Sequence, residues 1–255
     1  MHIAVLLRLS PMLGDELEIN ATHTDIERVG LTMVMNELDD QALEQAVLLK
    51  EATGGTVTAL ALASEGADAV LRVAFARGAD RVVVVNGGDL DPFDSRSAAL
   101  AFATAFGQLG IDLALVGVQT PYDVLGQTAP FLAAALGWPQ VGVVSDVAPG
   151  EETVRVTKEL GGGALAVLDV RLPAVLGIQA APSPPRYVSS SRLRQAMMSG
   201  AGESLSVEPA RAACRQTLTR FRRPEATKTA IQLHGDAEQI ASQIIQVLHE
   251  KGIVD

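Results

Sequence analysis

The sequence predicts an α/β protein whose mainly parallel β-sheet is covered by helices on both faces. Short apolar runs alternate along the chain with stretches in which apolar residues recur at helical spacing, and this alternation is typical of strand–helix–strand units. The chain has 255 residues, of which 48% are hydrophobic, so it can bury a sizeable core. Only 4% of its residues are aromatic, so we expect Ala, Val and Leu to build that core.

The predicted strands and helices alternate through the first part of the chain, and we expect the sheet to end at about residue 145. The apolar runs that predict strands are residues 3–7, 56–62, 81–85 and 113–116. The amphipathic stretches that predict helices are residues 39–51, 67–77, 95–109 and 125–136. Gly78, Gly110 and Gly137 each follow one of these helices, where glycine suits the left-handed conformation that ends a helix.

The first helix carries a start signal. Asn36 precedes Asp39 by three residues, which predicts an N-cap with a capping-box-like arrangement. Asp39 and Asp40 then lie in the first turn, where acids usually stabilise the helix dipole. We therefore expect these three residues to serve the start of the helix.

A different pattern follows residue 146. Two alternating segments separated by the glycine turn at 161–163 predict a β-hairpin over residues 153–170. Because a strand follows this turn, the three glycines are interpreted as a hairpin turn and not as a phosphate-binding loop. The apolar run 173–178 comes next, and we place all of this in an α/β domain of residues 1–185.

Residues 186–255 are interpreted as an extended arm. Residues 200–209 lack core residues and indicate a linker. Residues 236–250 predict a terminal amphipathic helix, with Ile240 and Ile244 on its apolar face.

Composition excludes several classes of protein. The formal net charge of −10 argues against binding to nucleic acid or to an anionic membrane surface. No stretch reaches the about 18 consecutive apolar residues of a membrane-spanning helix, so we expect no membrane insertion. Cys214 is the single cysteine, which excludes an intrachain disulfide and a cysteine-based zinc site. The first residues lack the features of a signal peptide, and we expect a cytoplasmic protein.

No catalytic residue or metal site is predicted. The chain has no G-x-S-x-G motif, and its four histidines are scattered without a zinc-binding pair. Cys214 lies in an arginine-rich stretch, whose charges would favour its thiolate, but an incidental half-buried thiol is the favoured interpretation.

The loop after the fourth predicted strand is the strongest candidate site. The strand ends at Val116, a polar loop containing Gly117 and Gly126 follows, and a helix starts near residues 125–128. Open α/β sheets bind ligands at the carboxyl ends of strands, and the N–H groups at a helix start suit a phosphate. Gln127 and Thr128 would add side-chain donors, although an ordinary capped loop gives the same pattern.

Taken together, the motifs resemble the β subunit of electron transfer flavoproteins over nearly the whole chain. Met35–Asp39 and the following Ala42–Ala46 are similar to the family segment M-N-P-F-[DE]-x-x-A-[VL]-E-[EQ]-A. The further matching segments, in the order and spacing of the family, are residues 71–81, 117–128, 136–139, 172–175 and 185–187.

The resemblance implies an adenine-nucleotide α-hydrolase-like (Rossmann-like) fold and a non-catalytic electron carrier. Such a β subunit pairs with an α subunit that carries most of the FAD. It passes electrons from flavin dehydrogenases to a quinone-reducing or other redox acceptor. Its own pocket holds AMP, or a second FAD in electron-bifurcating relatives. The arginine-rich stretch 186–223 either clasps the α subunit or the FAD phosphates, or is a solvated helix.

The resemblance also implies site residues. Those that match the family's nucleotide pocket are Val5, Asn36, Asp123, Gly126, Gln127 and Thr128. Those that match its partner-docking segment, residues 186–195, are Arg186, Tyr187, Ser190, Arg192 and Leu193.

Several positions depart from the family pattern. Residues 121–124 replace an acid-rich loop, Gly126 replaces an asparagine, and Ser190 replaces an apolar docking residue. Leu38 and Met12 stand where the family has aromatic residues, while residues 233–253 resemble the extension of nitrogen-fixation-linked and bifurcating relatives. The alternatives are therefore a bifurcating subunit with FAD in the β pocket, a stand-alone nucleotide-binding stress-type protein, and a relative that has lost its nucleotide.

Overall fold

The computed structural model describes residues 1–12, 17–88, 90, 93–198, 202–208, 218–223 and 232–254. These residues belong to two compact units, Met1–Thr219 and Arg220–Asp255.

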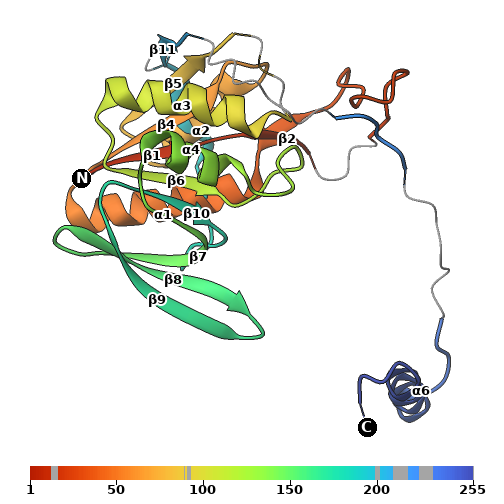
Figure 1. Cartoon of the computed structure of the whole chain (residues 1–255). Helices are drawn as coiled ribbons and strands as arrows, with labels where there is room; N and C mark the ends of the chain where they lie inside the picture. The colour runs from red at the N-terminus through yellow and green to blue at the C-terminus, as the bar shows by residue number, and fades with distance from the viewer. Residues whose placement is uncertain are drawn as a thin grey trace. The chain divides into compact units, whose positions relative to one another are not determined.

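The described residues of the larger unit form a nine-stranded sheet in the order β11-β5-β4-β1-β6-β10-β7-β8-β9 (Figure 1). The strands are β1 (His2–Leu6), β4 (Thr56–Leu62), β5 (Arg81–Asn86), β6 (Leu113–Gly117), β7 (Gln140–Pro149), β8 (Thr153–Gly161), β9 (Ala164–Arg171), β10 (Ala174–Ile178) and β11 (Glu203–Ser206). Each pair of neighbouring strands from β11 to β7 is parallel. Strand β8 pairs antiparallel with β7 and forms an antiparallel hairpin with β9. The predicted α/β class and the hairpin are confirmed.

Helices cover both faces of this sheet. They are α1 (Glu37–Thr53), α2 (Ala67–Arg77), α3 (Ser95–Leu109) and α4 (Thr128–Leu136), and α5 (Ser190–Met198) packs against α2. Alternate strand residues face opposite sides, so Val5 packs with α1 and α2, whereas Leu6 packs with α3 and α4. Both cores consist mainly of Ala, Val and Leu, as the composition predicted.

Two predictions about the sheet are wrong. The sheet does not end near residue 145, because β10 inserts between β6 and β7 and is fully buried. Residues 200–209 are not simply a linker, because β11 pairs with β5 and Arg81 forms an ion pair with Glu203 at 2.7 Å. A short polar strand such as β11 has no hydrophobic periodicity by which a sequence could reveal it.

Other boundaries shift by less. Helix α4 begins at Thr128 and not at residue 125, and α3 and α4 end at left-handed glycines, Gly110 and Gly137, as predicted. A small antiparallel pair, β2 (Leu9–Pro11) and β3 (Met33–Met35), was not predicted.

The smaller unit contains α6 (Ala237–Glu250), within one residue of the predicted terminal helix. Its start has a full capping box, in which Asp236 and Gln239 bond each other's backbone amides. None of the residues of α6 is buried.

Cys214 lies outside the described residues. Among the described helices, none is both long and apolar enough to cross a membrane.

Candidate functional site

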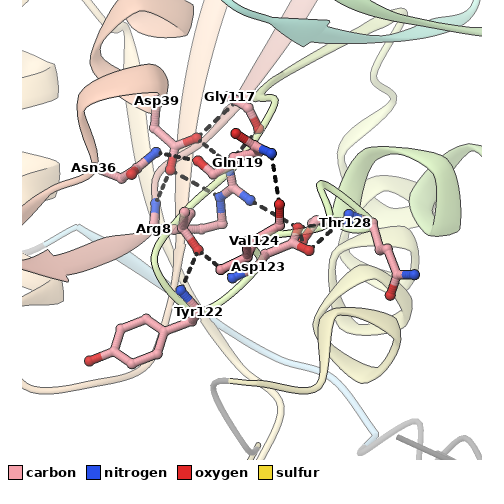
Figure 2. Close-up of polar contacts among 11 residues, drawn as sticks. Arg8, Asn36, Asp39, Gly117, Gln119, Tyr122, Asp123, Val124 and Thr128 are labelled. Atoms are coloured by element: carbon pink, nitrogen blue, oxygen red, sulfur yellow. Dashed lines mark hydrogen bonds and ion pairs between the residues drawn. The ribbon is translucent and has the colours of Figure 1, made fainter. Parts of the chain in front are cut away.

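The candidate site lies where the order of strands along the sheet reverses. The chain runs outward from β1 through β4 and β5, then returns to β6 on the other side of β1. The carboxyl ends of β1 and β6 therefore flank the point at which open α/β sheets form a ligand crevice. Three segments meet there, the end of β1, the start of α1 and the loop 118–127 (Figure 2).

Arg8 joins these segments by its side chain. Its Nε donates to Oδ2 of Asp39 at 3.0 Å, and its Nη2 donates to Oδ1 of Asp39 at 2.7 Å and to the carbonyl oxygen of Gly117 (Figure 2). Its Nη1 reaches Oδ2 of Asp123 at 3.4 Å. Asp39 is 0% exposed, so the cluster is a buried one in which a single arginine faces two carboxylates.

The start of α1 approaches the end of β6 very closely. The backbone N–H of Gly117 donates to Oδ1 of Asp39 at 2.9 Å. A Cβ on Gly117 would lie 2.5 Å from that oxygen and 2.7 Å from the Asp39 nitrogen, so no larger residue fits. Asp39 therefore links two elements and does not serve mainly the helix dipole, which corrects the expectation from the sequence.

Asn36 also has a role other than the predicted one. It is the N-cap residue of α1 by position, but its side chain makes no capping hydrogen bond. Its Nδ2 instead donates to the carbonyl oxygen of Gln119 at 2.9 Å, which ties α1 to the loop. The predicted capping box at this helix is therefore wrong, since both of its side chains are used for long-range contacts.

Asp123 organises the loop and the start of α4. Its Oδ1 accepts the N–H of Gln127 at 2.8 Å, and its Oδ2 accepts the N–H of Thr128 at 2.9 Å and the Thr128 hydroxyl at 2.6 Å. Asp123 thus supplies the negative charge at the positive end of α4 that a bound anion would otherwise supply. Gly126 closes the turn with φ +64°, and a Cβ there would lie 2.5 Å from the Val118 carbonyl oxygen.

Tyr122 packs on the outer side of the loop. Its ring points away from the Arg8 cluster (Figure 2) and meets Phe93 edge-on, with centroids 5.1 Å apart. The guanidinium of Arg28 lies 5.6 Å from the Tyr122 centroid, a cation–π arrangement. Tyr122 therefore connects the loop to segments that precede α1 and α3.

The predicted pocket residues differ in how deeply they are buried. Asn36, Asp123 and Thr128 are brought together and are nearly fully buried, whereas Gly126 and Gln127 are partly exposed. Val5 is in β1, with its side chain wholly inside the core that contacts α1 and α2. Arg8 was not predicted, although a charged residue directly after a buried strand at the reversal point was a usable signal.

Asp123 predicts a measurable pH dependence. Burial would raise the pKa of its carboxyl, but the Thr128 hydroxyl and the amides of Gln127 and Thr128 hold it below the usual 3.8. A carboxyl whose pKa is lower in the folded than in the unfolded state stabilises the fold at pH values above its unfolded-state pKa. This contribution is lost as the pH falls through the folded-state pKa. We therefore expect Asp123→Asn to destabilise the protein most above about pH 5, and the difference from wild type to shrink below about pH 4.

Denaturant titrations of both proteins across this pH range would measure that difference. A constant gap between wild type and Asp123→Asn at all pH values would contradict the assignment.

The predicted docking segment is anchored to α1. The Nη2 and Nε of Arg186 donate to the carboxylate of Glu44 at 2.9–3.1 Å, and its Nη1 donates to Glu51 at 2.6 Å. The backbone N–H of Arg186 also donates to Glu44, at 2.9 Å. Arg186 therefore holds its own segment in place, and its pKa is raised by both carboxylates.

The residues after this anchor lie at the surface. Tyr187 is 86% exposed, Ser190 and Arg192 are exposed, and Leu193 is partly buried. Ser190 begins α5, which packs against α2. The segment thus presents polar groups outward from a fixed starting point.

Comparisons with known proteins agree on one family. Residues 24–212 match the electron transfer flavoprotein domain. A protein of Methylophilus methylotrophus described as electron transfer flavoprotein subunit beta is 30% identical over 98% of each chain. A subunit beta of Syntrophomonas wolfei is 28% identical over 96% of each chain. A mitochondrial subunit beta of Oryza sativa subsp. indica is 33% identical over 71% of this chain and 72% of its own.

Proposed function

We propose that this chain, which belongs to the electron transfer flavoprotein family as a β subunit, binds an adenine nucleotide beside the loop 118–127. We also propose that it supports an FAD-bearing α subunit. The family's proteins are electron carriers, so the chain has no catalytic role of its own in this proposal. The observation that carries the proposal is the Arg8–Asp39–Asp123 cluster, because it holds the loop at the reversal point of the sheet.

The pocket residues divide into two roles. Asn36, Asp123 and Thr128 are too deeply buried for extensive ligand contact, so we assign them to holding the loop in shape. Gly126 and Gln127 are partly exposed and are assigned direct contact with the nucleotide. Val5 has no exposed side chain, so we assign it a supporting role from within the core beside α1.

The phosphate position follows from the hydrogen bonds already made. Asp123 accepts the N–H groups of Gln127 and Thr128, and position 130 is a proline without an N–H group. A phosphate at the start of α4 would therefore have to displace Asp123 or bind beside it. A nucleotide held mainly through its base and ribose is compatible with the loop as it stands.

The nucleotide is either AMP or a second FAD. A bifurcating subunit with FAD in this pocket is the second candidate, supported by the resemblance of residues 233–253 to bifurcating relatives. Family membership favours either of these over a stand-alone stress-type protein.

The partners follow from the same proposal. The α subunit carries the main FAD, flavin dehydrogenases deliver electrons, and a quinone-reducing or other acceptor removes them. Docking uses the segment that starts at Arg186, with Tyr187, Ser190, Arg192 and Leu193 at or near its surface. The cytoplasmic location stays a prediction.

Co-expression of this chain with the α subunit of its source organism tests the heterodimer. We expect a stable complex with a flavin absorption spectrum. Failure of the two chains to co-purify, or a complex without flavin, would contradict the proposal.

A loop variant tests the pocket. Combining Gln127→Ala with Thr128→Val removes the hydroxyl that donates to Asp123 and the partly exposed Gln127 carboxamide. We expect a loss of about 1–3 kcal/mol in unfolding free energy, since the buried carboxylate loses a partner. We also expect less adenine nucleotide to be retained after purification. Gln108→Leu, on the exposed surface of α3, is the control that should retain nucleotide as wild type does.

Unchanged nucleotide content and an unchanged thermal midpoint in the double variant would argue against this pocket.

A further inference from the structure

The two edges of the nine-stranded sheet differ in how they are protected. Strand β11, at one edge, has four residues, and its Glu203 forms an exposed ion pair with Arg81. Strand β9, at the other edge, has eight residues, and residues 164–168 contain no charged residue and no proline. Proteins usually protect an edge strand by keeping it short or by placing charges or proline on it. Strand β11 follows this rule and β9 does not.

Strand β9 exposes apolar side chains on both of its faces. Leu165 and Val167 are 61% and 63% exposed, on the face opposite to the one that carries the buried Val156 of β8. Leu168 pairs with Val156 and lies on the core-facing side, yet it is still 40% exposed. The apolar surface of β9 therefore continues from one face to the other around the edge of the sheet.

The described residues of this unit leave that surface uncovered. Helices α3 and α4 lie over β6 and β10 on the same side of the sheet as Leu165 and Val167, but no described residue of β8 or β9 belongs to the core beneath these helices. Strand β9 also ends the strand order, so its outer edge pairs with no other described strand (Figure 1). An exposed apolar edge of this kind marks a contact with another protein.

Charge argues against a second copy of this chain as that protein. The hairpin over residues 153–171 carries three basic and two acidic residues, so it is close to neutral within a chain of net charge −10. Two copies joined at this edge would repel each other through the acidic remainder of each chain. A different protein does not have to repeat that negative charge, and a β subunit implies one such partner, the α subunit.

The apolar character of the edge also suits a permanent partner. Interfaces that stay assembled are more hydrophobic than those that form and dissociate repeatedly. The proposed docking segment for dehydrogenases is polar by contrast, since Ser190 and Arg192 are exposed there. An electron carrier must release its redox partners after each transfer, whereas the two subunits of the heterodimer stay together. The edge of β9 therefore fits the α subunit better than it fits a dehydrogenase.

We propose that the α subunit docks along β9. An extended segment of the α subunit adds to the edge of the sheet as a further strand, and its apolar side chains cover Leu165 and Val167. Backbone hydrogen bonds along β9 then supply affinity, and the side chains on its two faces supply specificity. This inference rests on the proposed heterodimer and assigns the surface that holds it together.

Hydrogen exchange and a charged variant test this surface in the full-length chains. In the wild-type heterodimer we expect amide exchange over residues 164–171 to be at least tenfold slower than in the isolated chain, because β9 gains a strand partner. Leu165→Lys combined with Val167→Lys is expected to weaken the heterodimer at least tenfold, measured as the dissociation constant by analytical ultracentrifugation. Val29→Lys is the matched control, since Val29 is 94% exposed and lies outside the sheet, and it should bind as wild type does.

The possible outcomes separate this inference from the proposed function. A flavin-containing heterodimer in which exchange over residues 164–171 is unchanged, or which the double lysine variant forms with wild-type affinity, overturns the inference and leaves the proposed function intact. Slow exchange over these residues already in the isolated chain also overturns it, because this chain or a second copy then covers β9. Failure of the wild-type chains to form any complex overturns both.

Discussion

Arg8→Met is expected to lower the free energy of unfolding by about 3–5 kcal/mol, because it leaves the fully buried carboxylate of Asp39 without the cation that it contacts. Asp123 loses a charge partner in the same step. Urea denaturation of the full-length chain near neutral pH would measure this loss.

Two further variants make that result interpretable. Adding Asp39→Leu to Arg8→Met removes the stranded charge and should recover part of the lost stability. Arg155→Met removes an arginine whose pair with Asp169 is exposed, so it should unfold almost as wild type does. A loss for Arg8→Met no larger than that for Arg155→Met would show that the buried cluster does not hold the loop.

Arg186→Met is expected to lower the free energy of unfolding by about 2–3 kcal/mol. This loss is smaller than that expected for a fully buried ion pair, because Arg186 is 28% exposed. The partner left behind, Glu44, is only 4% exposed. Because Arg186 fixes the start of the proposed docking segment, we also expect faster amide hydrogen exchange over residues 187–196. In the assembled heterodimer the KM for a partner dehydrogenase should rise, with little change in kcat.

Arg192→Met is the matched control, since it removes an exposed arginine six residues further along the same segment. It should leave stability and hydrogen exchange near wild type. Wild-type exchange over residues 187–196 in Arg186→Met would contradict the anchoring role.

Local signals explain why most elements could be predicted. The strands β1, β4, β5 and β6 are short apolar runs, and α1 to α4 have apolar residues at helical spacing, so each is encoded within its own segment. The position of β10 is not encoded in this way. A run of five buried apolar residues has the same sequence pattern at the edge of a sheet as at its centre.

The candidate site could be predicted only in part, because the contacts that hold it join residues far apart in the sequence. The loop 118–127 carries local signals, a strand end and a helix start, and both are present. The contacts that hold it, Arg8 with Asp39 and Asp123, join residues 31 and 115 positions apart. The sequence indicates that Asp39 stabilises its own helix, because nothing nearby in the sequence indicates Arg8 as its partner. The Arg186–Glu44 pair spans 142 positions and was missed in the same way.

The most direct test is to identify the nucleotides released when the purified complex of this chain with its α subunit is denatured. Mass spectrometry and absorbance would give their identity and their ratio to protein. We expect one FAD for the α subunit and, for each β subunit, one further equivalent of AMP or FAD that the Gln127→Ala, Thr128→Val variant loses. A complex that holds a single FAD and no second adenine nucleotide would contradict it.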